Sequence, residues 1–175
     1  DEHHGRAAEM SPLALPEPGA TPDAPALAEV FLRDPEGMAA RAFMNPPSMA
    51  DGPNHAAWRR AEIPGANGHA TARAVARVYG ALAGGGAQDG VRVLSREGLE
   101  RCREEQSRGL DAVLLLPTRI AGGFMRSQPD VPGGSFGPGE GAFGHPGAGG
   151  SVGFADPEAG VSFGYVMNRM GPHIL

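Results

Sequence analysis

Lysine is absent from the 175 residues, and all 15 basic residues are arginine. This absence excludes a phosphate-binding P-loop, which requires a Gly-Lys-Ser/Thr sequence. It also excludes any reaction in which these 175 residues would have to supply a catalytic lysine. Cysteine occurs once, at Cys102, so the sequence offers neither a disulfide framework nor a cysteine-based zinc site.

The composition also argues against nucleic acid, a membrane-spanning segment and a metal ion. A net charge of −5, scattered arginines and only 6% aromatic residues argue against a nucleic-acid-binding surface. No apolar run approaches the roughly 18 residues of a membrane-spanning helix. Adjacent His3 and His4 are expected to point apart and have no matching carboxylate cluster, so we expect solvated side chains and no metal site. His55, His69 and His173 receive no role, and no cofactor is predicted.

Glycine and proline are abundant, with 28 and 17 residues, yet 41% of the chain is hydrophobic. Because the apolar residues cluster in periodic segments, the composition predicts a globular fold with long loops. The chain starts at Asp1 without an initiator methionine and stops at Ile174-Leu175 directly after an expected strand and turn. We therefore expect a piece of a longer protein.

Helical patterns occupy the first part of the chain. The clearest runs from Thr71 to Ala83, where Thr71 can cap the helix, apolar residues recur at helical spacing, and Gly84–Gly86 ends it. Tyr79 is expected in the core on this helix. Further helices are predicted at 26–33, 35–43 and 96–106. Residues 1–25 and 46–68 are expected to be irregular, with Trp58 anchored on the core.

Strand patterns occupy the second part. We predict strands at 113–116, 120–125, 151–155 and 161–168, the last two joined by the turn residues Asp156–Gly160 into an antiparallel hairpin. Tyr165 is expected to be a core residue. Helices first and an antiparallel sheet last favour an α+β fold. Residues 1–110 would form a mostly helical and loop portion and residues 111–175 the strands, within one incomplete domain.

Three glycine patterns overlap between residues 139 and 153. Gly139–Gly144 matches the G-x-G-x-x-G dinucleotide fingerprint, but neither a strand before it nor a helix after it is predicted. Gly149–Gly153 matches the G-x-S-x-G nucleophile elbow, although a strand pattern follows where that motif requires a helix. Asp156 and His173 follow in the order of a catalytic triad but lie too close in the chain. The third pattern is His145-Pro146-Gly147, which is a weak signal by itself.

Its wider context makes the third pattern informative. Phe143–Met170 resembles the C-terminal strand pair of the β-lactamase-related esterases, a group similar to class C β-lactamases. Segments 64–73, 105–107, 116–119 and 122–124 resemble the same group, so the resemblance covers most of residues 60–171. It implies a β-lactamase/transpeptidase-like fold and a serine hydrolase that cleaves small-molecule esters or related acyl substrates through an acyl-enzyme.

The resemblance also implies site residues. His145 would orient the substrate side of the site, Gly147 would let substrate pass close to the strand, and the Ala148 N–H would contribute to the oxyanion hole. Pro146 departs from the commoner threonine, which favours an esterase over a β-lactamase or a D-amino-acid peptidase.

The family's Ser-x-x-Lys and Tyr-x-Asn/Ser motifs are absent, and the resemblance places them upstream of Asp1. We therefore expect no hydrolase activity from these residues alone. The missing N-terminal part of the fold would pair with the final sheet, so its absence would leave a strand edge and an apolar face uncovered. The alternative is a non-catalytic or truncated relative with a binding role or no function.

Overall fold

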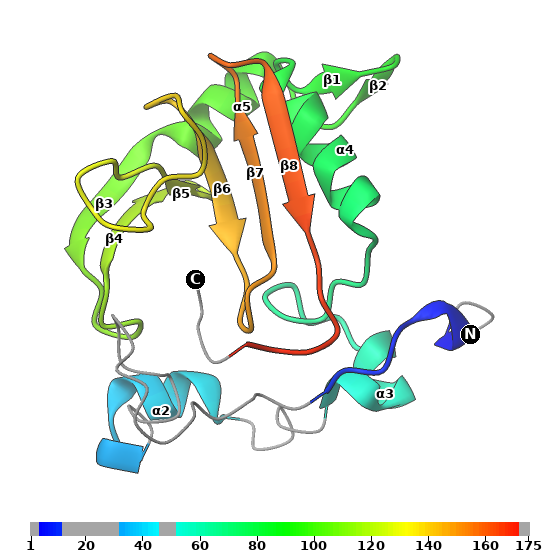
Figure 1. The fold of residues 1–175 in the computed structure, drawn as a ribbon, viewed down its shortest axis with the longest axis vertical. Coiled ribbons are helices and arrows are strands. Elements are labelled where there is room, and N and C mark those ends of the chain that lie inside the picture. Colours follow the sequence, from blue (N-terminus) through cyan, green and yellow to red (C-terminus); the bar gives the residue numbers. More distant parts are fainter. Residues whose placement is uncertain (1–3, 12–31, 46–51, 172–175) are drawn as a thin grey trace.

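The computed structural model describes residues 4–11, 32–45 and 52–171. At its centre lies a six-stranded antiparallel sheet with the strand order β3-β4-β5-β6-β7-β8 (Figure 1). The strands are β3 (Glu105–Leu110), β4 (Pro117–Ala121), β5 (Met125–Arg126), β6 (Phe143–Pro146), β7 (Val152–Asp156) and β8 (Val161–Tyr165). Most of the helical residues precede this sheet, as expected for an α+β fold.

The hairpin predicted at the end of the chain is present. Strands β7 and β8 pair from Asp156–Val161 at the turn to Val152–Tyr165 at the open end. Gly160 closes the turn with a φ of 66°, a left-handed conformation that glycine adopts without strain. Because side chains alternate along a strand, Ser162 and Gly164 lie on one face of β8 and Phe163 and Tyr165 on the other.

Helix α4 (Ala72–Ala83) covers the first of these faces and packs along β7 and β8. Its N-terminus is capped as predicted, because the Thr71 side chain accepts a hydrogen bond from the Ala74 N–H. A Cβ atom on Gly164 would lie only 2.5 Å from the Ala72 carbonyl oxygen, so glycine allows the helix to approach β8 very closely. The Ser162 hydroxyl donates a hydrogen bond of 2.9 Å to the Ala76 carbonyl and fixes this contact.

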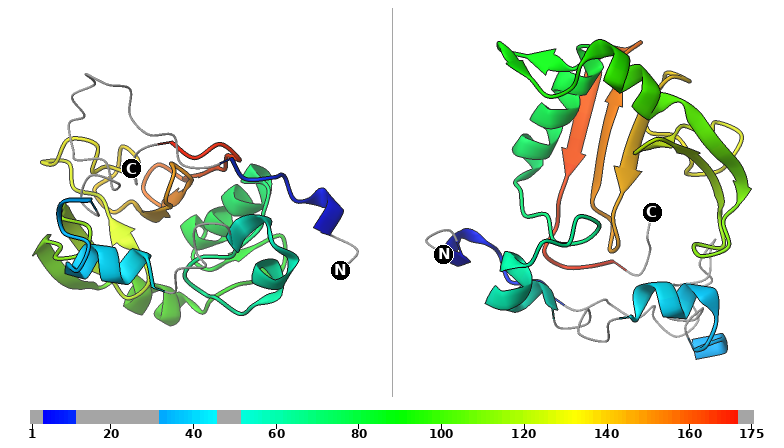
Figure 2. Two further views of the ribbon diagram at one scale, coloured as in Figure 1. Left: turned by 90° about the horizontal axis from the view of Figure 1, so that it is seen from below. Right: turned by 180° about the vertical axis from the view of Figure 1, so that it is seen from behind.

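Helix α5 (Arg96–Arg103) completes the layer behind the sheet, as Figure 2 shows from the rear. Buried side chains of α4, α5, β6 and β7 meet there in one core cluster, with Tyr79 packed against it. The cluster consists of Leu82, Leu99, Phe143 and Ala155. Tyr79 therefore has the core position expected from the sequence.

The remaining elements are short. They are η1 (His4–Arg6), α2 (Met38–Phe43), η3 (Gly52–Asn54), α3 (Ala56–Arg60) and the hairpin of β1 (Ala87–Gln88) and β2 (Val91–Arg92). Helix α2 begins three residues later than predicted, and α3 lies in a segment expected to be irregular. Of the helix predicted at 26–33, residues 26–31 lie outside the described part. Trp58 is half-buried against Gly52 and His69, so it does not anchor on the core cluster.

Three predicted elements were wrong. The segment 120–125 is not one strand, because it contains the end of β4, a turn at residues 122–124 and the start of β5, and Ile120 pairs with Met125 across that turn. Residues 113–116 form the turn between β3 and β4 and not a buried strand, because the Asp111 carboxylate accepts hydrogen bonds from the Val113 and Leu114 N–H groups. Strand β4 then begins at Pro117, which was expected to break a strand. Helix α5 ends at Arg103, and Glu105 already belongs to β3. The division expected at residue 110 therefore falls between two paired strands of one sheet.

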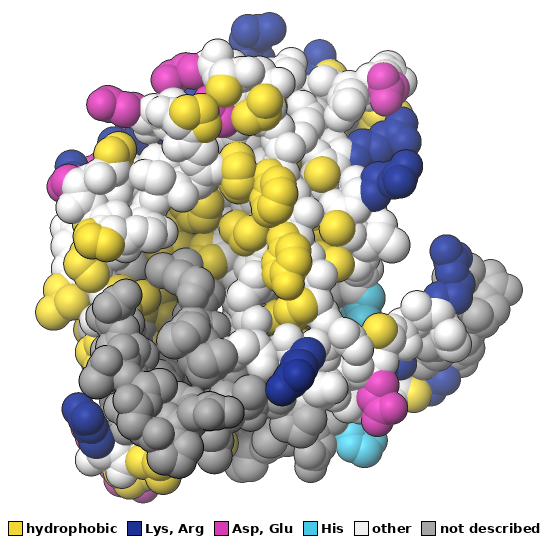
Figure 3. All heavy atoms as spheres, viewed as in Figure 1, with side chains coloured by type: hydrophobic (Ala, Val, Ile, Leu, Met, Phe, Trp, Pro, Cys, Tyr) yellow, Lys and Arg dark blue, Asp and Glu magenta, His cyan; other side chains and the backbone are white. Residues whose placement is uncertain are grey.

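The second face of the β7–β8 hairpin is open in the described part of the chain. Val161, Phe163 and Tyr165 are 45%, 46% and 49% exposed, and Phe163 stacks on Phe154 of β7 at a centroid distance of 5.4 Å. Figure 3 shows this hydrophobic band on the face opposite α4. Placing Tyr165 in the core was therefore wrong, since helix α4 covers only the other side of its strand.

Candidate functional site

His145 is the exposed residue of an otherwise buried strand. Phe143, Gly144 and Pro146 are buried along β6, and His145 pairs with Gly153 of β7. The His145 Nδ1 atom lies 2.6 Å from the Pro146 carbonyl oxygen. A carbonyl can only accept, so in the neutral imidazole this contact requires the proton on Nδ1 and leaves Nε2 as an acceptor. The ring can therefore offer a basic nitrogen to a ligand.

The turn after β6 presents Ala148. The Gly147 N–H donates to the Ser151 carbonyl at 2.6 Å, and the Gly150 N–H donates to the Gly147 carbonyl at 3.0 Å. Ala148 is exposed between them, and no hydrogen bond to its N–H occurs among the described residues. The Ala148 N–H, which lies two residues beyond the end of β6, is therefore a backbone donor without a partner among the described residues.

Glycine at 147 has a local steric cause. A Cβ atom there would lie 2.2 Å from the Ser151 Oγ atom across the turn. The same turn is held from outside, because Gly149 packs against Met167 and Met170 and its carbonyl accepts a hydrogen bond from the Gly171 N–H at 2.9 Å. The turn is thus fixed by its own hydrogen bonds and by the segment that follows β8.

Neither competing glycine pattern has the structural context of its motif. Gly139–Gly144 runs from a loop into β6, and Gly149–Gly153 joins two strands. A helix follows neither segment, so they do not have the geometry of a dinucleotide-binding turn or of a nucleophile elbow.

Asp156 supports the loop that precedes β6, and sequence inspection had assigned it only to a turn. Its fully buried carboxylate accepts hydrogen bonds from the backbone N–H groups of Gly139, Glu158 and Ala159. The bond from Ala159 does most to lower the pKa of Asp156, and those from Gly139 and Glu158 reinforce it against the opposing effect of burial. The ionised side chain therefore fastens the glycine-rich loop to the β7–β8 turn.

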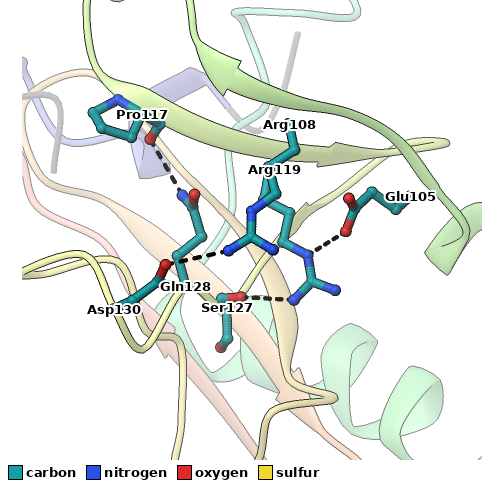
Figure 4. Close-up of polar contacts among 7 residues, drawn as sticks. All are labelled: Glu105, Arg108, Pro117, Arg119, Ser127, Gln128 and Asp130. Atoms are coloured by element: carbon teal, nitrogen blue, oxygen red, sulfur yellow. Dashed lines mark hydrogen bonds and ion pairs between the residues drawn. The ribbon is translucent and has the colours of Figure 1, made fainter.

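A network of arginine hydrogen bonds and ion pairs lies at the edge of the sheet that β3 and β4 form (Figure 4). Arg119 of β4 pairs with Glu105 of β3 and donates a bond of 3.1 Å to the Ser127 carbonyl. Arg108 of β3 forms an ion pair of 3.2 Å with Asp130. The Arg119 side chain also lowers the pKa of Glu105 through its hydrogen bond. These contacts tie the β3–β4 hairpin to residues 127–130, away from His145.

The other histidines and the candidate metal ligands give no second site in the described part of the chain. The His69 Nδ1 atom lies 2.9 Å from the Asn67 carbonyl, and its ring packs edge-on to Trp58. His3 and His173 lie outside the described residues. Residues 4–11, 32–45 and 52–171 contain no group of three or more histidine, cysteine or acidic side chains that could hold a metal ion. Among the same residues, no helix has the length and hydropathy to span a membrane.

Comparison with known proteins identifies relatives of the whole chain. Residues 11–174 match the family described as Beta-lactamase. The chain is 50% identical over 113 residues to the esterase/beta-lactamase LipL of Mycobacterium tuberculosis, covering 63% of this chain and 24% of LipL.

Solved structures agree. A penicillin-binding protein homologue from Caulobacter crescentus is 41% identical with a TM-score of 0.75, over 99% of this chain and 42% of its own. A family VIII carboxylesterase is 42% identical with a TM-score of 0.68, over 77% and 35%. EstA from Arthrobacter nitroguajacolicus is 28% identical with a TM-score of 0.71, over 97% and 42%. The chain thus has a β-lactamase/transpeptidase-like fold and spans less than half the length of these relatives.

Proposed function

The chain belongs to the β-lactamase family, and on that basis we propose that it supplies one wall of the active site of a serine hydrolase. His145 and the Ala148 N–H form this wall. The observation that carries the proposal is that both are exposed within four residues at the end of β6, among neighbours that are buried or already hydrogen-bonded. Such an arrangement suits a strand that borders a binding site, because exposed polar groups without a partner among the described residues are available to a ligand.

Each group has a role in acyl transfer. The Ala148 N–H donates to the oxyanion that forms when a nucleophile attacks the acyl carbon, and a donor of this kind stabilises the transition state by about 3 kcal/mol. The His145 imidazole, with Nε2 as an acceptor, orients or polarises the hydroxyl groups on the substrate side of the site. Gly147 places no side chain between these two groups. No metal or cofactor takes part in this scheme.

The nucleophile comes from polypeptide outside these 175 residues. The serine of a Ser-x-x-Lys motif needs its lysine to accept a proton, and lysine is absent here. We propose that this remaining polypeptide, the N-terminal part of the same fold, pairs with the β8 edge and covers the face formed by Val161, Phe163 and Tyr165. In support, β8 pairs only with β7 among the described strands, and its apolar face is open.

We propose an ester as the substrate. One relative with a solved structure is named as a family VIII carboxylesterase. LipL is named as both an esterase and a β-lactamase. Pro146 occupies the position where the family commonly has threonine, so no hydroxyl from this position can bind a substrate carboxylate. The ester proposal therefore rests on the names of the relatives and on the absence of a hydroxyl group at position 146.

Two measurements test the function. The 175-residue chain alone should not hydrolyse a p-nitrophenyl ester, because it has no nucleophile. In the longer protein that carries these residues, His145→Ala should lower kcat/KM by about 100-fold or more, the usual effect of removing a positioned acid–base group. His55→Ala is the matched control, since His55 is exposed at the start of α3 and makes no side-chain capping bond.

Turnover by the purified short chain would contradict the missing nucleophile, and unchanged kinetics in His145→Ala would remove His145 from the site. One observation favours the alternative, a non-catalytic relative with a binding role. Because lysine is absent, these residues contain no Ser-x-x-Lys motif. A start codon at Asp1, with no second subunit that supplies Ser-x-x-Lys, would support it. An upstream reading frame with Ser-x-x-Lys and then Tyr-x-Asn/Ser would support the enzyme.

A further inference from the structure

The strand that carries His145 is poorly supported on one side. Strand β5 consists of two residues, and these pair with Phe143 and Gly144 of β6. His145 and Pro146 extend beyond this pairing, so among the described strands only β7 supports them. Proline has no backbone N–H, so Pro146 cannot donate to a further strand at this end of β6.

Tyr79 of α4 reaches this position by passing over Gly153. Gly153 pairs directly with His145, and a Cβ atom on it would lie 2.2 Å from the Tyr79 Cε2 atom. Any larger residue at 153 would therefore displace the ring. Because Gly153 has no side chain, the Tyr79 ring can cross β7 and lie beneath β6 on the α4 side of the sheet.

The ring is held in this place by its neighbours. Tyr79 packs edge-on to Phe124 at a centroid distance of 6.2 Å, and Phe124 packs in the same way on Phe143 at 4.9 Å. The Tyr79 phenol oxygen faces the His145 backbone N–H closely enough for this group to lower the pKa of Tyr79. Burial raises the pKa of Tyr79 above its ordinary value, and the His145 backbone N–H opposes this effect only in part. The phenol is therefore neutral at physiological pH and takes no part in proton transfer as a phenolate.

We propose that Tyr79 is a positioning residue, which crosses β7 at Gly153 and holds the His145 backbone so that the imidazole and the Ala148 N–H face the substrate. This inference rests on the proposed function of the His145 wall. Tyr79 takes the place of the strand partner that β5 is too short to provide. A displacement of about 1 Å in such a group is enough to reduce catalysis strongly, so a hydroxyl remote from the reacting atoms can control the rate.

Tyr79→Phe tests the contact, because it removes the hydroxyl and keeps the ring that fills the space beside Gly153. Amide hydrogen exchange, followed by NMR in the intact protein, should be about five-fold faster at His145, as expected for one lost hydrogen bond. The amides of β7 and β8 should be unchanged. Ser107→Ala is the control: its side chain is exposed on the edge strand β3, and its loss of a hydroxyl should leave His145 unaffected.

Kinetics of the intact enzyme separate this inference from the function on which it rests. Tyr79→Phe should lower kcat for an ester about ten-fold with little change in KM, whereas Ser107→Ala should change neither. If His145→Ala loses activity but Tyr79→Phe leaves both exchange and kcat unchanged, Tyr79 has no positioning role and the proposed function stands. If His145→Ala has normal kinetics, both proposals fail, whatever the exchange rates show. Faster exchange throughout β6, β7 and β8 would reveal a general loss of stability and would overturn the local role.

Discussion

Replacing Asp156 with asparagine should destabilise the fold by far more than an ordinary polar substitution. The carboxylate has no exposed surface, and its Oδ2 atom accepts the Gly139 N–H at 2.7 Å. Its Oδ1 atom accepts the N–H groups of Glu158 and Ala159 at 3.1 and 3.0 Å. Asparagine retains the shape and one carbonyl oxygen, which can keep the second pair of bonds. Its NH₂ group then faces the Gly139 N–H, and two donors cannot bond to each other.

The magnitude follows from these contacts. Losing one hydrogen bond to a charged acceptor costs about 1.5–3 kcal/mol. The other two bonds weaken as well, since bonds to an ionised acceptor are roughly twice as strong as those between neutral groups. We expect the free energy of unfolding to fall by about 2–4 kcal/mol, a large part of the roughly 5–15 kcal/mol that stabilises a typical domain.

Urea unfolding at pH 7, followed by circular dichroism and Trp58 fluorescence, measures this loss in the intact protein. Asp130→Asn is the control, because Asp130 forms an exposed ion pair with Arg108 and should change stability by less than about 0.5 kcal/mol. A loss in Asp156→Asn no larger than the loss in this control would refute the reasoning.

The effect also has a predicted pH dependence. The folded state lowers the pKa of Asp156, so its ionised form stabilises the protein above the unfolded-state pKa of about 3.9. This contribution disappears as the pH falls through the lower folded-state value. The gap in stability between the wild type and Asp156→Asn should therefore be constant near neutral pH and shrink below about pH 4. A gap that stays constant at still lower pH would show that the charge of Asp156 contributes nothing.

Two further substitutions test the packing and the N-cap of α4, and a third serves as a control. Gly164→Ala should lower the free energy of unfolding by about 1–3 kcal/mol, because its Cβ would lie 2.5 Å from the Ala72 carbonyl oxygen and force the helix outward. Gly65→Ala, with no atom within 4 Å of the added carbon, is the control and should be neutral or stabilising by up to about 1 kcal/mol when both variants are unfolded thermally. Thr71→Ala removes the N-cap bond and should cost about 1 kcal/mol; an unchanged melting temperature would show that the cap is dispensable.

The sequence predicted those elements whose signals are local. Helix α4 was found almost to the residue, because a capping threonine, an apolar stripe and three glycines agree with one another. The β7–β8 hairpin was found because two apolar runs flank a turn that contains proline and glycine. In each case the segment's own residues decide its structure, and tertiary contacts only place it.

Elements that depend on distant contacts were missed. All six residues of β3 are exposed, so no alternation of hydrophobic and polar side chains marks it as a strand, and its pairing with β4 creates it. The apolar residues 113–116 were taken for a strand, whereas the side chain of Asp111 folds them into a turn. Tyr165 was assigned to the core because periodicity shows that a strand has two faces but not which of them is covered.

The candidate site was predictable to a similar extent. The sequence pattern predicted no strand at 143–146. Only the resemblance placed His145 on a strand, and in the structure that strand is β6, which precedes the β7–β8 hairpin. The contact with Tyr79 gave no signal of its own, since it joins a helix to a strand far along the chain. Gly153 carries the information, but a glycine in a strand indicates only that another group approaches closely and does not say which one.

Gly147 shows why a glycine beside a site is weaker support for function than an exposed side chain. The resemblance to esterases explains it by the passage of substrate, whereas the turn itself already demands glycine, because a Cβ would meet the Ser151 Oγ atom at 2.2 Å. Gly147→Ala would therefore disrupt the turn and reduce activity whether or not substrate passes there. His145 has no such local duty: its ring is exposed, and its polar contact among the described residues is with the carbonyl of the next residue. Its substitution leaves the turn intact, so loss of activity in His145→Ala can be attributed to the wall itself.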